Sequence, residues 1–447
     1  MRCCMLFSLI LASALLLSFF LMIPVYATST WSTQTVGEAI QGEPISLAIG
    51  SNGIPQIAYS QYTNAYEGTS TWNLTYASWN GSAWEIQTLA PQVRGQGSSI
   101  ALDSSNNPHI CYDYSTPFKS DLNYMRWTGS NWTSQTIDSS SSLSITEEYL
   151  ALDTHNNPHA LYTEGNNLMY ASWTGSNWAI QTVDSVVASS TFYSDSFAMD
   201  SNNYAHILYG VQTGTATYYG EPTLLYNVKY ADWNGSGWSI QTVFTNVTSF
   251  SNVALDSHSY PHFTYTINGP LKYAGWNGST WKTQTIDSKP GYNDAGFYAS
   301  DVCTSGFLTI DKHNNPQISY WRYNYAEDTS NDIGLMYAYW TGSSWNIQNV
   351  DQNGTWYGAG PIALDSTGIP HMAYPSVSYS SFFVDIKYAV LTFGSSTTPS
   401  TLAPFIIILS LVVAIIAIAL VVSIIAYKHT KEKNAQEKQR LIGEVYE

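Results

Sequence analysis

The chain reads IALDSSNNPHICY at 100–112 and, after a short interval, LNYMRWTGSNWTSQTI at 122–137. The first stretch has two apolar runs on either side of a polar turn that ends in Pro-His. The second stretch has two alternating runs, and a Trp stands on each side of the turn that joins them. Period-two alternation around turn residues is typical of antiparallel hairpins. The unit therefore predicts four consecutive strands, named A to D in chain order.

The same unit occurs seven times. Copies of strands A and B lie at 46–59, 100–112, 150–162, 197–209, 253–265, 308–320 and 362–374. Copies of strands C and D lie at 74–89, 122–137, 168–183, 228–243, 271–286 and 335–350, and the seventh, at 386–394, stops before strand D. The strand that the seventh copy lacks stands near the other end of the chain, as WSTQTV at 31–36.

This displaced strand indicates a closed ring, because an open array would leave unpaired strand edges at both ends. A repeat of this length with four strands is typical of one blade of a β-propeller. The sequence therefore predicts an all-β, seven-bladed β-propeller in which an N-terminal strand completes the last blade. The predicted fold also includes one C-terminal transmembrane helix.

The two ends of the chain carry targeting signals. Residues 1–27 have an early Arg, an apolar run and a cleavage-like end, which predicts a signal peptide. The propeller is expected at 28–394, and a Ser/Thr/Pro stalk at 395–403. Residues 404–427 contain an apolar run long enough to cross a bilayer, and the basic residues of 428–447 predict a cytoplasmic tail. We therefore expect a single-pass membrane protein whose propeller is extracytoplasmic.

The predicted extracytoplasmic part is strongly acidic. Residues 28–427 hold 10 Lys or Arg and 28 Asp or Glu, a net charge near −18. Such a surface repels nucleic acid, so no nucleic-acid partner is expected. It suits cations, neutral glycans or basic proteins, and it also favours solubility.

Three residue types recur at fixed places in the repeat. The Trp residues that flank the C–D turn are expected to pack between blades, because large aromatic side chains bury area between stacked sheets. An Asp ends strand A at 103, 153, 200, 256, 311 and 365, and a His begins strand B at 109, 159, 206, 262 and 371. Ringed carboxylates are able to hold a cation, but side-chain capping of the A–B turn explains the same residues. No metal and no cofactor are predicted.

Two other residue types carry little functional information. Cys111 and Cys303 fall in blades 2 and 6, which are far apart in a ring, so no disulfide is expected. Sequons that permit N-glycosylation stand at Asn73, Asn80, Asn131, Asn234, Asn246, Asn277 and Asn353. At Asn80, Asn234 and Asn277 the Asn is already explained by an Asn-Gly turn.

Function is expected where the repeats differ from one another. The B–C and D–A connections vary, and alternating strand direction places both on one face of the disc, where loops on a rigid scaffold usually carry recognition. These connections combine aromatic rings with charged groups, which suits glycans and proteins. The candidate binding residues are Tyr66, Glu67, Trp72, Tyr114, Glu148, Tyr219, Glu221, Tyr298, Trp321, Arg322, Tyr323, Trp356, Tyr357 and Phe383. No catalytic residue is assigned.

The repeat resembles those of secreted six- or seven-bladed propeller lectins of the fucose-binding type. More distantly, it resembles the Asp-box propellers of sialidases. The resemblance covers 30–394 and implies the architecture rather than an activity. The Asp-box pattern is not matched, because the turn Trp173-Thr-Gly-Ser-Asn-Trp178 lacks the Asp. The arginine cluster that the sialidase resemblance implies is also missing, since the predicted ectodomain has only Arg94, Arg126 and Arg322.

Three functions follow from these observations. The favoured one is a membrane-anchored binding or adhesion module for glycans or proteins. A glycoside hydrolase or lyase is the first alternative, with Glu147 or Glu148 paired with Asp294 as acid and base. A structural component of the cell envelope is the second. No nucleophile elbow, phosphate-binding loop, dinucleotide fingerprint or zinc spacing is present in the sequence.

Overall fold

The structure is a computed structural model. It describes residues 29–40, 45–63, 71–93, 97–116, 118–187, 190–218, 221–267, 269–288, 303–322, 334–352, 359–377, 383–393 and 421–440. The chain divides into two compact units, of which the larger is Trp31–Thr392 and the smaller combines Met1–Thr30 with Phe393–Glu447. The larger unit is a β-propeller, and the described part of the smaller unit contains a helix at 421–440.

Each of the first four blades is a four-stranded antiparallel sheet whose strands follow one another in the chain. Blade 1 contains β2 (Ile45–Ile49), β3 (Pro55–Thr63), β4 (Thr71–Trp79) and β5 (Trp84–Val93). Blade 2 contains β6 (Ser98–Leu102), β7 (Pro108–Thr116), β8 (Lys119–Trp127) and β9 (Trp132–Ser140). Blade 3 contains β10 (Ile145–Leu152), β11 (Pro158–Glu164), β12 (Asn167–Trp173) and β13 (Trp178–Ser185). Blade 4 contains β14 (Phe192–Met199), β15 (Ala205–Tyr218), β16 (Glu221–Trp233) and β17 (Trp238–Val247).

The remaining blades follow the same plan with two variations. Blade 5 has its first strand in two pieces, and contains β18 (Ser249–Phe250), β19 (Ala254–Leu255), β20 (Pro261–Thr266), β21 (Leu271–Trp276) and β22 (Trp281–Asp287). Blade 6 contains β23 (Cys303–Ile310), β24 (Pro316–Arg322), β25 (Gly334–Trp340) and β26 (Trp345–Asp351). Blade 7 contains β27 (Ile362–Leu364), β28 (Pro370–Val377), β29 (Phe383–Phe393) and the N-terminal β1 (Ser29–Ile40).

The first strands of the blades form the inner ring of the propeller. Each one contacts the first strand of the next blade, through β2, β6, β10, β14, β19, β23 and β27, and β27 contacts β2 again. The strands are short and rich in small apolar residues, which suits this crowded position. The ring is therefore closed, and the predicted seven-bladed fold is confirmed.

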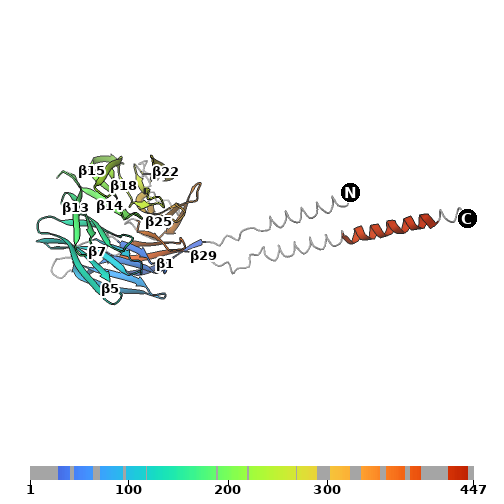
Figure 1. The fold of residues 1–447 in the computed structure, drawn as a ribbon, viewed down its shortest axis with the longest axis horizontal. Helices are drawn as coiled ribbons and strands as arrows, with labels where there is room; N and C mark the ends of the chain where they lie inside the picture. The colour runs from blue at the N-terminus through green and yellow to red at the C-terminus, as the bar shows by residue number, and fades with distance from the viewer. Residues whose placement is uncertain are drawn as a thin grey trace. The chain divides into compact units, whose positions relative to one another are not determined.

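Closure depends on β1, which pairs with β29 at the outer edge of blade 7, as Figure 1 shows. Trp31 of β1 packs edge-on against Tyr337 of blade 6, with ring centroids 5.2 Å apart. Its indole N–H also donates to Gln348 Oε1 at 3.2 Å. The prediction that the displaced strand completes the last blade is confirmed.

The first Trp of every strand D packs against a Tyr on strand C of the preceding blade. The centroid distances lie between 5.2 and 6.2 Å. The pairs are Trp84–Tyr388, Trp132–Tyr76, Trp178–Tyr124, Trp238–Tyr170, Trp281–Tyr230, Trp345–Tyr273 and Trp31–Tyr337. Edge-on aromatic pairs add to the stabilisation that buried area gives. The repeated Trp residues therefore join the blades, as predicted.

The repeated Asp caps the A–B turn. Asp103 Oδ1 accepts hydrogen bonds from the backbone N–H of Ser105 and of Asn107, both at 2.8 Å. His109 places Nε2 3.7 Å from Asp103 Oδ2, and its Nδ1 lies 2.5 Å from the hydroxyl of Tyr124. Blades 1 and 6 use Gln in place of this His, and there the Tyr hydroxyl donates to the Gln Oε1. The predicted turn cap is confirmed.

The predicted membrane helix lies mostly outside the described residues, which include only 421–427 of 404–427. Within the described part of the chain, no helix combines the length and the apolar character that a membrane crossing needs. The predicted signal peptide and stalk also lie outside the described residues. Cys111 is a buried free thiol, and the side chain of Cys303 is not described.

Candidate binding groove

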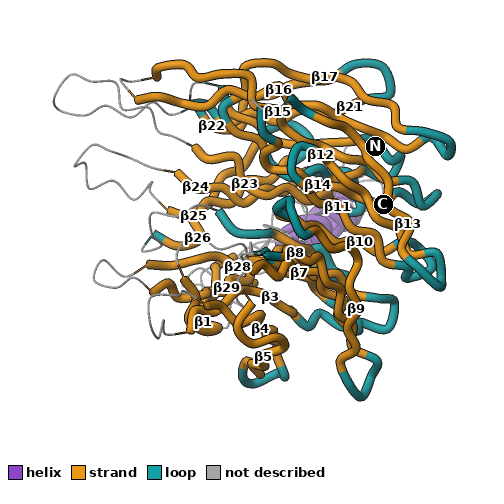
Figure 2. Tube along the Cα trace, turned by 90° about the vertical axis from the view of Figure 1, so that its left-hand side faces the viewer, coloured by secondary structure: helices purple, strands orange, loops and turns teal. Residues whose placement is uncertain are grey.

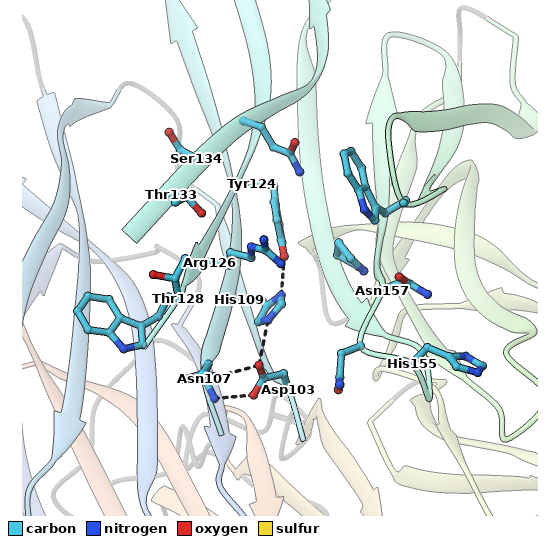
Figure 3. Close-up of a pocket in the computed structure, with 16 residues that line it drawn as sticks. Asp103, Asn107, His109, Tyr124, Arg126, Thr128, Thr133, Ser134, His155 and Asn157 are labelled. Atoms are coloured by element: carbon cyan, nitrogen blue, oxygen red, sulfur yellow. Dashed lines mark hydrogen bonds and ion pairs between the residues drawn. The ribbon is translucent and has the colours of Figure 1, made fainter. Parts of the chain in front are cut away.

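A polar groove of about 670 Å³ lies between blades 2 and 3 (Figure 3). It is lined by the A–B and C–D turns of the two blades and by the strand ends beside them. The lining residues are Asp103, Asn107, His109, Tyr124, Arg126, Trp127, Thr128, Thr133, Ser134 and Gln135 of blade 2, and His155, Asn156, Asn157, Pro158, Trp173 and Gly175 of blade 3. We call it the blade 2–3 groove.

The wall that blade 2 contributes contains the chain of contacts from Asp103 through His109 to Tyr124, which Figure 3 shows in a line. Burial lowers the pKa of His109, and the nearby Arg126 adds to this effect, although Asp103 opposes it. Burial acts to raise the pKa of Asp103, but hydrogen bonds from Asn107 and Ser105 outweigh it and leave the pKa below its ordinary value. Burial raises the pKa of Tyr124. At neutral pH the imidazole is therefore neutral and the carboxylate is charged.

Arg126 is the distinctive side chain of the groove. It lies on β8, opposite His109 of β7 and Thr133 of β9, and it is exposed. Figure 3 shows its side chain beside the contact between Tyr124 and His109. Within the described part of the chain, no carboxylate lies within ion-pair distance of its guanidinium, and no hydrogen bond uses its donors.

The opposite wall comes from blade 3. Asn156 has a left-handed backbone conformation, with φ 64°, and this turns its side chain toward blade 2. Its Oδ1 accepts from the N–H of Ser104 at 2.9 Å, and its Nδ2 donates to the Ser104 hydroxyl at 3.0 Å. Trp173 is half-buried and packs edge-on against Trp178, with centroids 5.5 Å apart. The lining of this wall therefore combines an amide with the exposed part of an indole.

Small side chains keep the blade 3 wall open. A Cβ at Gly175, in the C–D turn, would meet nothing within 4 Å. In blade 4 a Cβ at the equivalent Gly235 would meet the hydroxyl of Tyr204 at 3.1 Å. Tyr204 stands at the repeat position that Asn157 occupies in blade 3, and Asn157 is held back by its hydrogen bond to Asp153 Oδ2 at 2.9 Å. Blade 3 therefore lacks the Tyr ring that stands beside the C–D turn in blade 4.

The groove is at the opposite end of the strands from the predicted binding face. Figure 2 shows many of the short turns in teal along its right side. Because its turns are uniform in length, the sequence predicts that this face belongs to the scaffold. The sequence signal that could have indicated the groove is the variation at the repeat position of Arg126. This position is occupied in the seven blades by Ser78, Arg126, Ser172, Asp232, Gly275, Tyr339 and Val390.

Five of the predicted binding residues have described side chains. Trp72 and Tyr114 are half-buried and pack against the cluster between blades 1 and 2. Glu148 is buried on β10, where a Cβ at Gly97 would meet its carboxylate. Trp321 is buried in the cluster between blades 6 and 7. Arg322 is buried as well.

Arg322 joins two blades. Its guanidinium pairs with Asp287, which also accepts a hydrogen bond from the Tyr320 hydroxyl at 2.7 Å. Asp287 ends strand D of blade 5, whereas Arg322 and Tyr320 end strand B of blade 6. This buried ion pair therefore connects blade 5 to blade 6.

The remaining predicted residues are not placed by the structure. Tyr66, Glu67, Tyr219, Tyr298, Tyr323, Trp356 and Tyr357 lie outside the described residues, as does Asp294 of the proposed acid–base pair. For Glu147, Glu221 and Phe383 only the backbone is described. Among the described residues, no group of three or more His, Cys, Asp or Glu is placed to hold a metal ion.

No protein-family model matches the chain, and no curated protein matches it. Several solved structures are similar in fold. An α-L-arabinanase of Penicillium chrysogenum is 9% identical with a TM-score of 0.45, over 82% of this chain and 98% of that one. The β-propeller domain of the Trilobed protease from Pyrococcus furiosus is 7% identical with a TM-score of 0.44, over 82% and 99%. A leech intramolecular trans-sialidase is 10% identical with a TM-score of 0.39, over 80% and 68%.

These likenesses concern the propeller fold, and at such identities and TM-scores they carry no argument about the activity of this chain. The resemblance to fucose-binding lectins stays a prediction.

Proposed function

We propose that this protein is an extracytoplasmic binding module that recognises a glycan in the blade 2–3 groove. In this proposal 1–27 directs export, 404–427 anchors the chain in the membrane, and 428–447 lies in the cytoplasm. The observation that carries the binding proposal is the lining of the groove. The Trp173 indole, amides, hydroxyls and the guanidinium of Arg126 surround one cavity of a size that holds a small ligand.

The chemistry of the groove favours binding over catalysis. The buried His109 is neutral and engaged with Tyr124, and the same pairing occurs in blades 3, 4, 5 and 7. Asp103 is occupied by the amides of its own turn. These groups therefore belong to the scaffold. Trp173 offers a face on which a sugar ring stacks, and the amides offer partners for its hydroxyls.

The test is glycan binding by the full chain in detergent, first on an array and then by calorimetry. Trp173→Ala removes an aromatic wall of the groove, and we expect it to weaken binding at least about tenfold, the loss that follows from about 1.4 kcal/mol. The matched control is Trp340→Ala, which removes the equivalent Trp of blade 6, packed on Trp345 in the same geometry. Its binding should stay within about twofold of the wild type, a change well under 1 kcal/mol.

Equal losses in the two variants would show that the Trp acts through stability and not through the groove. Failure of the wild-type chain to bind any glycan on the array would sink the proposal. Anchoring is tested separately by alkaline extraction of membranes that contain the full chain. Release of the chain into the supernatant would contradict the proposed anchor.

A further inference from the structure

We propose that the blade 2–3 groove selects saccharides that carry an acidic group, a carboxylate or a sulfate, and that Arg126 binds this group. This inference rests on the proposed function and names the substrate class of the same groove. Arg126 differs from the other charged groups that line or border the cavity, because they already have hydrogen-bond partners.

The carboxylates at the groove are already occupied. Asp103 Oδ1 accepts from two backbone amides, and its Oδ2 accepts from Asn107 Nδ2 at 2.9 Å. Asp153 of blade 3 repeats this arrangement with the N–H groups of His155 and Asn157. Hydrogen bonds of this kind satisfy a carboxylate within its own turn. Neither group is therefore available as the principal partner of a ligand cation.

The guanidinium of Arg126 is in the opposite situation. Its five N–H donors have no acceptor among the described residues, although it lines a cavity. Lys229 and Lys387 are paired, with Asp184 at 2.8 Å and with Asp351 at 3.0 Å, whereas Lys312, unpaired among the described residues, is exposed and does not line the groove. A planar guanidinium matches the two oxygens of a carboxylate or sulfate, and such bidentate hydrogen bonds are stronger than neutral ones. The ligand group that would satisfy Arg126 is thus an anion.

The rest of the lining suits a saccharide. Trp173 lies on the blade 3 wall, and Thr128, Thr133 and Ser134 of blade 2 supply hydroxyls near Arg126. Aromatic faces bind the apolar side of a sugar ring, whereas hydroxyl and amide groups bind its oxygens. An acidic sugar offers both features next to its anionic group.

The strongly acidic composition of the propeller does not oppose this local pairing. At physiological ionic strength, exposed charges further apart than about 8 Å are largely screened. The repulsion from distant carboxylates is therefore weak, while a direct contact with Arg126 is screened far less. The direct contact with Arg126 therefore decides whether an acidic group is bound.

The experiment measures binding of matched oligosaccharides to the full chain in detergent by calorimetry. The probes are hexagalacturonate and its fully methyl-esterified form, together with sulfated and unsulfated dextran oligosaccharides. We expect at least one acidic probe to bind at least about tenfold more tightly than its neutral counterpart, as one charge-assisted contact allows. The pair in which the preference appears tells whether the group is a carboxylate or a sulfate.

Three variants locate the effect. Arg126→Ser installs the residue found at this repeat position in blades 1 and 3, and it should bring the ratio of acidic to neutral affinity close to one. Arg126→Lys keeps the charge without the planar fork, and we expect it to retain part of the preference. Lys312→Ser removes an exposed cation of blade 6 and should change nothing. Thermal unfolding of each variant checks that the fold is intact.

The proposal is overturned if acidic and neutral probes bind equally, or if Arg126→Ser keeps the preference. Tighter Arg126-dependent binding of an oligoglutamate peptide than of every saccharide would assign the groove to acidic peptides instead. Neutral probes that bind without an acidic preference would sink this inference and leave the proposed function standing. Absence of all saccharide binding would remove both.

Discussion

At the scale of single residues, position in the repeat decides what a side chain does. Tyr162 of blade 3 is fully buried, and its hydroxyl donates to Asp138 of blade 2 at 2.6 Å. Tyr59 holds the same repeat position in blade 1, but Gly37 stands where the Asp would be. The Tyr59 hydroxyl is buried with no hydrogen-bond partner among the described residues, and burial raises its pKa to about 12. Two equivalent tyrosines therefore have different energetic roles.

This difference gives a paired prediction. Tyr162→Phe should lower the free energy of unfolding by about 1–3 kcal/mol, because it removes the donor to Asp138 Oδ2 and leaves only the Ser139 N–H on Oδ1. Tyr59→Phe should be neutral, or stabilising by up to about 1 kcal/mol, because it removes a hydroxyl that was buried without a partner. Urea unfolding of the two variants measures both values, and equal destabilisation by the two changes would contradict the assignment.

At the scale of elements, the outermost strand of blade 7 is the one that the chain supplies out of order. β1 pairs with β29, and Trp31 connects it to blade 6. The strand stabilises the propeller by pairing an edge and by packing Trp31, and neither effect depends on where in the sequence the strand is encoded. The propeller therefore needs β1 at the outer edge of blade 7, whichever end of the chain encodes it.

Relocation of this strand tests that view. A chain of residues 41–393, which lacks β1, should fail to unfold cooperatively, because it exposes the edge of β29 and one face of blade 6. A rearranged chain that starts at 41 and carries 29–40 after Phe393 through a short Gly-Ser linker should recover a cooperative transition. The control is the same rearranged chain with Trp31→Ala, which we expect to be less stable by about 2–4 kcal/mol. Thermal unfolding by circular dichroism distinguishes the three chains.

At the scale of the whole molecule, one buried or half-buried histidine occurs at the same repeat position in each of five blades. Burial lowers the pKa of His109, His159, His206, His262 and His371 below the ordinary 6.5. The unfolded chain therefore binds more protons than the folded one once the pH falls below about 6.5, the ordinary pKa of histidine. Their contribution to stability is complete above that pH and declines as the pH falls toward the lowered values. Asp103, Asp153 and Asp365 have lowered pKa values too, and their contribution is lost only near and below 3.8.

We expect stability to fall between pH 7.5 and pH 5, by at most about 1.4 kcal/mol per pH unit for each histidine. Blades 1 and 6 already use Gln56 and Gln317 at this position, where each accepts the Tyr hydrogen bond. Replacement of all five histidines by Gln should therefore preserve the fold and flatten the pH dependence. Urea unfolding midpoints at the two pH values measure the slope. An unchanged slope in the five-Gln variant would assign the acid sensitivity to other groups.

The sequence by itself determined the fold of the propeller. Seven copies of one four-strand unit and the displaced WSTQTV at 31–36 were sufficient, because period, turn chemistry and the need to pair edges are local or additive properties. The roles of the repeated Trp, Asp and His followed for the same reason, since these residues make the same contacts in each blade that carries them.

The groove was decided only by the tertiary structure. It depends on Arg126 of blade 2 and Trp173 of blade 3, on the absence of a large side chain at Asn157, and on the open space above Gly175. These residues belong to different blades, and no spacing along the chain shows that they face one cavity. The sequence pointed instead to the variable connections, where Trp321 and Arg322 are buried in contacts between blades. Repetition specifies how each blade folds, whereas a cavity between two blades depends on how their side chains fill the space that they share.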